Sequence, residues 1–152
     1  MWRSILGIIA GIVLGGIVVG LIEIPGNRLH PLPPGTDMSN WEAIKAHAAN
    51  APPAALVGVA IAWTVGPFVA GWLAAFIARR AHIMHGLIVG AIFVLLDLMN
   101  IVSLPHPTWL AIVGVVAPLV AGYLGGLLAA RMARSPTAGA PHYQTREQNV
   151  AC

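Results

Sequence analysis

The chain has 152 residues, of which 58% are hydrophobic and 9% charged, and its formal net charge is +3. Soluble domains carry about a quarter charged residues, and so short a chain could not bury this much apolar surface, so the composition predicts a membrane protein. Its basic residues lie at the ends of apolar runs without interleaved aromatic residues, which excludes a nucleic-acid-binding protein. The single cysteine, Cys152, excludes an intrachain disulfide and a cysteine-based metal site.

Four apolar runs are long enough to cross a bilayer as helices, which takes roughly 20 residues. They occupy residues 5–23, 54–78, 83–104 and 109–130. Because backbone amides and carbonyls cannot stay unpaired in lipid, each run must be helical. The sequence therefore predicts an all-α domain of four transmembrane helices over residues 1–134. The small and polar residues 135–152 predict a disordered cytoplasmic tail.

The loop 25–53, between the first two spans, has features of its own. Its proline-rich start, residues 25–34, is expected to be extended because proline blocks a helix. The segment Ser39-Asn-Trp-Glu42 then matches a capping box, in which Ser39 begins a helix. Trp41 and Ile44 follow at helical spacing. We therefore expect a short helix, roughly residues 40–50, lying on the outer membrane surface.

The orientation follows from the arginines, because cytoplasmic loops carry an excess of basic residues. One side of the four spans holds Arg3, Arg79, Arg80, Arg131 and Arg134. This pattern predicts that both termini and the turn 79–82 are cytoplasmic, while the loop 25–53 and the turn 105–108 face outward.

The second and fourth spans indicate an internal repeat. Residues 67–80 and 118–131 are identical at seven of fourteen aligned positions. Residues 6–11 of the first span also resemble residues 85–90 of the third. The repeated unit is then a helical hairpin, and both copies enter from the same side. A parallel repeat of this kind predicts a pseudo-twofold axis along the membrane normal.

Small residues let helix backbones approach each other in lipid. The residues expected to pack in this way are Gly7, Gly11, Gly15, Gly71, Gly122 and Gly126. We interpret them as contacts within one bundle, although the stripe in the first span could instead contact another subunit. Pro67 and Pro118 are predicted to kink their helices at matching depths.

A polar site is predicted at the outer end of the spans. Glu23 closes the first span and Asp97 lies in the third, and each is followed by a His-Pro pair that starts at His30 or His106. Asn100 shares a helix face with Asp97. If the hairpins pack about a twofold axis, the two acids and the two histidines are expected to converge at the outer mouth of the bundle. From the spacing to Gly7 and Gly86, Asp97 should lie roughly 7–8 Å deeper than Glu23 and be buried between helices.

Three interpretations of these polar residues remain open. Two carboxylates and two imidazoles could bind a divalent cation such as zinc, manganese or nickel. They could also exchange protons, because histidine titrates near neutrality. Alternatively, Glu23 is solvated at the interface, the His-Pro pairs are ordinary helix exits, and Asp97 bonds to a neighbouring helix.

The endings of the second and fourth spans, the Pro-Pro-Gly35 segment and the Pro-His-Pro107 turn resemble small four-helix proteins of the bacterial inner membrane that are uncharacterised. The resemblance covers about residues 1–134. It implies a location in the bacterial inner membrane but no activity. A glutamate in the first of four spans is also similar to small multidrug-resistance exporters. In those proteins the acid lies deep in the membrane, whereas Glu23 is expected at the outer end.

Two functional hypotheses follow. The first is a non-enzymatic accessory or assembly subunit, or a small homo-oligomer, whose partners are the lipid bilayer and other membrane proteins. The alternative is a small transporter or channel for protons or a cationic solute. The sequence contains no catalytic motif, and no cofactor is expected.

Overall fold

The computed structural model describes residues 2–134, which form five helices and no strand. The helices are α1 (Trp2–Leu29), α2 (Trp41–Ala49), α3 (Pro53–Ala78), α4 (His82–Ser103) and α5 (Thr108–Arg134). All except α2 are long and apolar enough to cross a membrane. The structure thus confirms an all-helical fold with four helices of membrane-spanning length and apolar character. The tail predicted over residues 135–152, with Cys152, lies outside the described residues.

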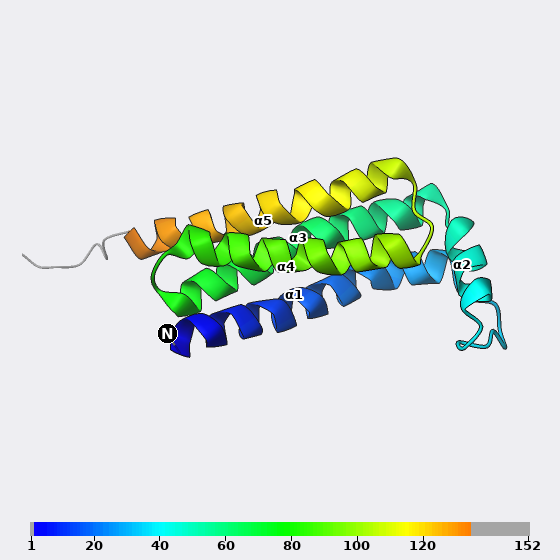
Figure 1. Cartoon of the computed structure of the whole chain (residues 1–152), viewed down its shortest axis with the longest axis horizontal. Helices are drawn as coiled ribbons and strands as arrows, with labels where there is room; N and C mark the ends of the chain where they lie inside the picture. The colour runs from blue at the N-terminus through cyan, green and yellow to red at the C-terminus, as the bar shows by residue number, and fades with distance from the viewer. Residues whose placement is uncertain (1, 135–152) are drawn as a thin grey trace, which may run out of the picture.

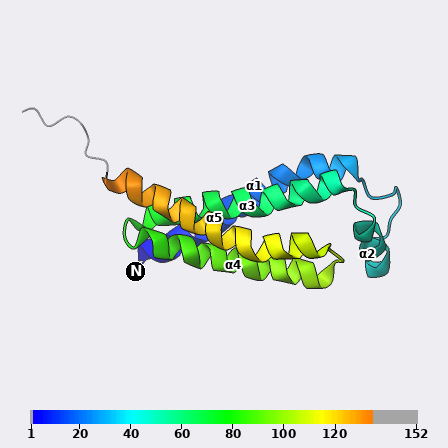
Figure 2. The same cartoon turned by 90° about the horizontal axis from the view of Figure 1, so that it is seen from above.

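The four long helices run side by side, and α2 lies across one end of the bundle (Figures 1 and 2). We call this the α2 end. The opposite end, here called the basic end, holds the start of α1, the α3–α4 turn and the end of α5 (Figure 1). Arg3 Nε donates to the Ile77 carbonyl at 3.2 Å, and Arg80 Nη2 donates to Ser4 Oγ at 3.3 Å. These bonds join α1 to α3 at the basic end.

α1 extends further than predicted. It passes through Pro25 and ends at Leu29, so the predicted end at Glu23 and the extended stretch from residue 25 are wrong. A proline inside a helix removes one hydrogen bond and crowds one preceding carbonyl, but it does not prevent one more turn. The amide of His30 closes that turn on the Gly26 carbonyl at 3.0 Å. Glu23 therefore lies about 9 Å inside the helix instead of at its end.

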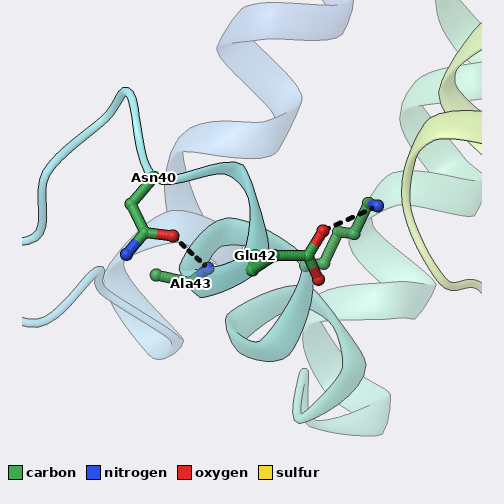
Figure 3. Close-up of polar contacts among 4 residues, drawn as sticks. Asn40, Glu42 and Ala43 are labelled. Atoms are coloured by element: carbon green, nitrogen blue, oxygen red, sulfur yellow. Dashed lines mark hydrogen bonds and ion pairs between the residues drawn. The ribbon is translucent and has the colours of Figure 1, made fainter.

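The predicted short helix is present as α2, but its N-cap differs from the prediction. Asn40 Oδ1 accepts from the Ala43 amide at 3.1 Å (Figure 3). Ser39 instead donates its amide and its hydroxyl to Asp37 Oδ1, at 2.8 and 2.7 Å. These two bonds hold the pKa of the Asp37 carboxyl below its usual value. Glu42 pairs with Lys45 at 3.2 Å (Figure 3) and does not complete a capping box.

The glycine stripe of α1 is covered by α3. A Cβ on Gly7 would lie 2.7 Å from the Ala74 carbonyl oxygen, and one on Gly11 would lie 2.5 Å from that of Ala70. At Gly15 a Cβ would be 2.7 Å from the Ala70 side chain. These three glycines are the buried residues of α1. The packing of these three glycines is therefore intramolecular, whereas contact of two other α1 glycines, Gly16 and Gly20, with another subunit stays a prediction.

A second set of close contacts joins α5 to α3 and α4. Added Cβ atoms on Gly71 and Gly126 would lie 2.8 Å from the Gly122 carbonyl oxygen and 2.7 Å from that of His82, respectively. Gly71 and Gly122 are equivalent positions of the sequence repeat, and they meet at one level of the bundle. However, α3 contacts α4, whereas α5 does not contact α1. The pseudo-twofold arrangement of the hairpins therefore stays a prediction.

Pro67 and Pro118 are fully buried, and α3 and α5 continue through them. The kink expected at each proline also stays a prediction. The core consists of small clusters such as Ala70, Ala74, Val89 and Phe93. The outside of the bundle is covered with large apolar side chains: Leu95, for example, is 61% exposed. Such a surface is suited to lipid.

Candidate functional site

A cavity of about 220 Å³ lies at the α2 end. It is lined by residues of α1, α2, α3 and α4 and of the loops that follow α1, α2 and α4. We call it the outer cavity. Its polar lining side chains are those of Glu23, Asn27, His30, His47, Asn100 and His106. The structure thus brings together four of the five residues singled out from the sequence. No lysine or arginine lines the cavity.

Asp97 is the fifth of those residues and does not line the outer cavity. It lies on α4, one turn before Asn100, and is only 6% exposed. Its Oδ2 atom is enclosed by protein and has no hydrogen-bond partner among residues 2–134. Burying such a group without a partner costs free energy, so an unsatisfied carboxylate oxygen in a folded protein calls for an explanation.

The structure confirms that Asp97 is buried and that Glu23 is partly exposed. The predicted depth difference of 7–8 Å is wrong, because the glycines used as reference points do not correspond. Gly7 packs at the level of Ala74, whereas Gly86 packs against Gly122, which lies level with Gly71. This shift of three residues removes roughly 4.5 Å of the difference.

His106 lies on the turn between α4 and α5 and forms one wall of the outer cavity. Its Nδ1 lies 2.9 Å from the Leu104 carbonyl oxygen. A carbonyl only accepts hydrogen bonds, so Nδ1 carries the proton and a neutral ring keeps its lone pair on Nε2. The ring also lies against Trp63 of α3, with a distance of 5.8 Å between ring centroids.

His30 and His47, which both line the outer cavity, form a stacked pair. Their ring centroids are 3.8 Å apart and their planes differ by 11°. His30 Nε2 donates to the His47 carbonyl at 3.0 Å, and His47 Nε2 donates to the His30 carbonyl at 3.2 Å. Each ring thus bonds to the other residue's backbone. We call this arrangement the histidine clamp, because it joins the end of α1 to α2.

His47 was not identified from the sequence as a site residue. It lies 17 positions after His30, on the far side of a loop, and no local spacing rule links them. Asn27 was missed because the first span was expected to end before it. The extension of α1 through Pro25 brings Asn27 to the cavity. A helix continued to residue 29 would have placed Glu23 and Asn27 on one face, four residues apart.

Within residues 2–134 no group of three or more histidine, cysteine, aspartate or glutamate side chains is arranged to hold a metal ion. The described residues therefore give no support to the interpretation as a zinc, manganese or nickel site.

Two other cavities differ from the outer cavity, because neither brings as many polar side chains together. A groove of about 470 Å³ runs between α3 and α5. Apart from Thr64, whose hydroxyl donates to the Ala60 carbonyl at 2.8 Å, its lining is apolar. A cavity of about 360 Å³ at the basic end is lined by Arg79 and His82 with apolar neighbours.

Comparison with known protein families, with curated proteins and with solved structures finds no match to this chain. The class that the fold itself defines is a multi-pass helical membrane protein. Its distinguishing feature is a small polar cavity at the α2 end, where helices α1, α3 and α4 meet the loops that follow them.

Proposed function

We propose that the protein is a small transporter or channel that binds protons or a small cationic solute in the outer cavity. One observation carries the proposal: Glu23, His30, Asn100 and His106 line the same cavity, and the buried, unpartnered Asp97 lies one turn from Asn100. Ionisable residues within membrane-spanning helices are costly, and they mark pathways for ions and protons more often than they stabilise a fold.

The size and charge of the cavity limit which solutes it can bind. Pockets for drug-sized ligands measure roughly 300–1,000 Å³, whereas this cavity measures about 220 Å³. It has room for several water molecules or for a solute of a few heavy atoms. The cavity is lined by the Glu23 carboxyl group and by no lysine or arginine, which favours a cation, and the Trp63 ring in the wall offers a further favourable surface to a cation.

The proposed location is the bacterial cytoplasmic membrane, with both termini in the cytoplasm. The arginine-rich basic end then faces the cytoplasm, as the positive-inside rule requires. The α2 end, with Asp37 and Glu42, faces outward. In this orientation the outer cavity opens toward the external solution, from which it would take its ligand.

Flux measurements in proteoliposomes test this proposal. Purified protein is reconstituted with a pH-sensitive dye inside the vesicles, and gradients of protons, Na⁺, K⁺ or methylammonium are imposed. We expect movement of at least one of these cations, largely lost in Asp97→Asn and reduced in Glu23→Gln. Asp37→Asn is the matched control, because Asp37 is an exposed loop carboxylate, and it should behave as wild type. Absence of flux for all four cations, or wild-type flux in Asp97→Asn, would contradict the proposal.

A second candidate is the accessory subunit or homo-oligomer, favoured by one feature of α1. Gly16 and Gly20 are spaced four residues apart, and nothing lies within 4 Å of a Cβ placed on either. Such a pair permits close approach of another helix in lipid. Cross-linking in mild detergent should then give a dimer or a larger complex that Gly16→Leu with Gly20→Leu removes. If the wild type and the double variant gave the same cross-linked species, this would argue against an interface at Gly16 and Gly20.

A further inference from the structure

α2 is attached to the bundle differently from the other helices. The four long helices pack against one another along their lengths, whereas α2 makes no close backbone contact with any of them. Figure 2 shows α2 beyond the ends of the spanning helices. Nevertheless His47 and Ala48 of α2 line the outer cavity. α2 therefore covers one side of the cavity, and the histidine clamp is what ties it there.

The clamp depends on the protonation of its two rings. Each Nε2 donates to a backbone carbonyl, so in the neutral state each Nδ1 carries the lone pair. A further proton can enter only at Nδ1, and it makes the ring a cation. If both rings become cations, two like charges face each other with 3.8 Å between centroids. Stacking is favourable for neutral rings, but repulsion opposes it when both rings are charged.

Few other charges act on the two rings. From α1, Glu23 lines the same cavity, and from the α4–α5 turn His106 does. Among residues 2–134 neither clamp ring forms an ion pair, so no carboxylate directly offsets the second charge. Asp97 lies deeper, on α4, and Arg28 is exposed and does not line the cavity. Glu42 and Lys45 of α2 pair with each other.

We propose that His30 and His47 are a pH-sensitive latch that holds α2 over the outer cavity when both rings are neutral and releases it when both are protonated. Histidine is the side chain whose ordinary charge change falls between about pH 5 and 8, so this is the range over which the latch is tested. The three residues between α2 and α3 form a short connection about which the released helix can pivot. As a gate for ligand, the latch rests on the proposed function, although its opening can be measured without any ligand.

The test follows the position of α2 by distance measurements between two spin labels. The full chain with Cys152→Ser carries Ala46→Cys on α2 and Ser103→Cys at the end of α4, both exposed positions. In lipid nanodiscs at pH 8 we expect one narrow distance distribution. Between pH 8 and pH 5 it should become broader and longer, because protonation of both rings sets like charges against each other. A distribution that does not change between these pH values overturns the proposal.

Three substitutions on this background distinguish the latch from a general response to acid. His47→Gln keeps an amide donor near the position of Nε2 but cannot become a cation, so its distribution should stay narrow at pH 5. His47→Ala removes the ring and the donor and should be broad already at pH 8. His106→Gln is the matched control, a cavity histidine outside the clamp, and should retain the full pH response. A pH response that survives in His47→Gln, or that disappears in His106→Gln, would assign the change to other groups.

The latch and the transport activity can fail separately. Cation flux with an immobile α2 would contradict the latch and leave the proposed function standing. A pH-dependent α2 in a protein without flux would contradict the transport proposal and leave the latch standing. Far-UV circular dichroism at pH 5 establishes that the bundle itself remains helical in each variant.

Discussion

Gly122 illustrates how a single residue sets the spacing of three helices. A Cβ at this position would lie 2.5 Å from the Gly86 carbonyl oxygen, and the Gly122 carbonyl itself faces Gly71. Since these neighbours are backbone atoms, they cannot move aside as a side chain would. We predict that Gly122→Ala lowers the free energy of unfolding by about 1–3 kcal/mol. Gly16→Ala, where space is open, should be neutral or stabilising by up to about 1 kcal/mol.

Both variants can be compared by unfolding in a denaturing detergent, followed by circular dichroism. Equal stability of Gly122→Ala and wild type would mean that α5 is not packed this closely against α3 and α4. A large loss in Gly16→Ala would mean that this face of α1 is covered by another chain.

Asp97 is the residue at which stability and function are expected to conflict. Its Oδ2 is buried without a hydrogen-bond partner, which costs about 1–3 kcal/mol by comparison with other buried polar groups. Leucine has the same branched shape with two somewhat larger methyl groups in place of the oxygens, so this replacement should leave the unfolding free energy unchanged or raise it by up to about that amount. The same variant should lose cation flux. Marked destabilisation by Asp97→Leu would instead indicate a structural role for the carboxylate.

At the scale of the element, α2 is short and has no buried residue of its own. Its stability therefore depends on its cap and on the histidine clamp. Asn40→Ala removes the bond to the Ala43 amide and should destabilise α2 by about 1 kcal/mol. Hydrogen exchange of the α2 amides should become faster. Ser39→Ala is the control, because the Ser39 hydroxyl bonds to Asp37 and not to the helix; the two variants should differ clearly if Asn40 is the N-cap.

At the scale of the whole molecule, the fold places both described ends of the chain, near Trp2 and Arg134, at the basic end (Figure 1). Cysteine labelling can establish how this end faces in cells. On a Cys152→Ser background, Met38→Cys near α2 should react with a membrane-impermeant maleimide added outside. Ala133→Cys at the end of α5 should react only after the membrane is permeabilised. The reverse pattern would invert the proposed orientation, and with it the side from which the outer cavity is reached.

The two hairpins show a limit of repeat reasoning at this same scale. Gly71 and Gly122 meet as equivalent residues near a twofold axis would. However, α3 contacts α4, whereas α5 does not contact α1. In addition, the glycines of the two hairpins pack about one turn out of register. Sequence identity between helices predicts that similar faces are used, but it does not determine the register in which those faces pack.

The sequence by itself determined the number of long apolar helices, their approximate bounds, the short helix near residues 41–49 and the use of glycines for packing. The reason is that these features depend on local quantities: the length of an apolar run, the pairing of backbone groups within a helix, and the space above a residue without a side chain. It also selected Glu23 and Asp97, because ionisable groups in apolar runs are rare, and His106 through the His-Pro pair that follows each acid.

The tertiary structure alone decided which polar residues meet. The helix continues through Pro25 because the turn closes on Gly26, and this brings Asn27 to the cavity. His30 reaches His47 across a loop, although no spacing in the chain relates them. Asp97 is buried and does not line the cavity, although Asn100, one turn further along the same helix, does. Each of these outcomes depends on how separate helices pack, and that free energy resides in contacts between residues far apart in the chain.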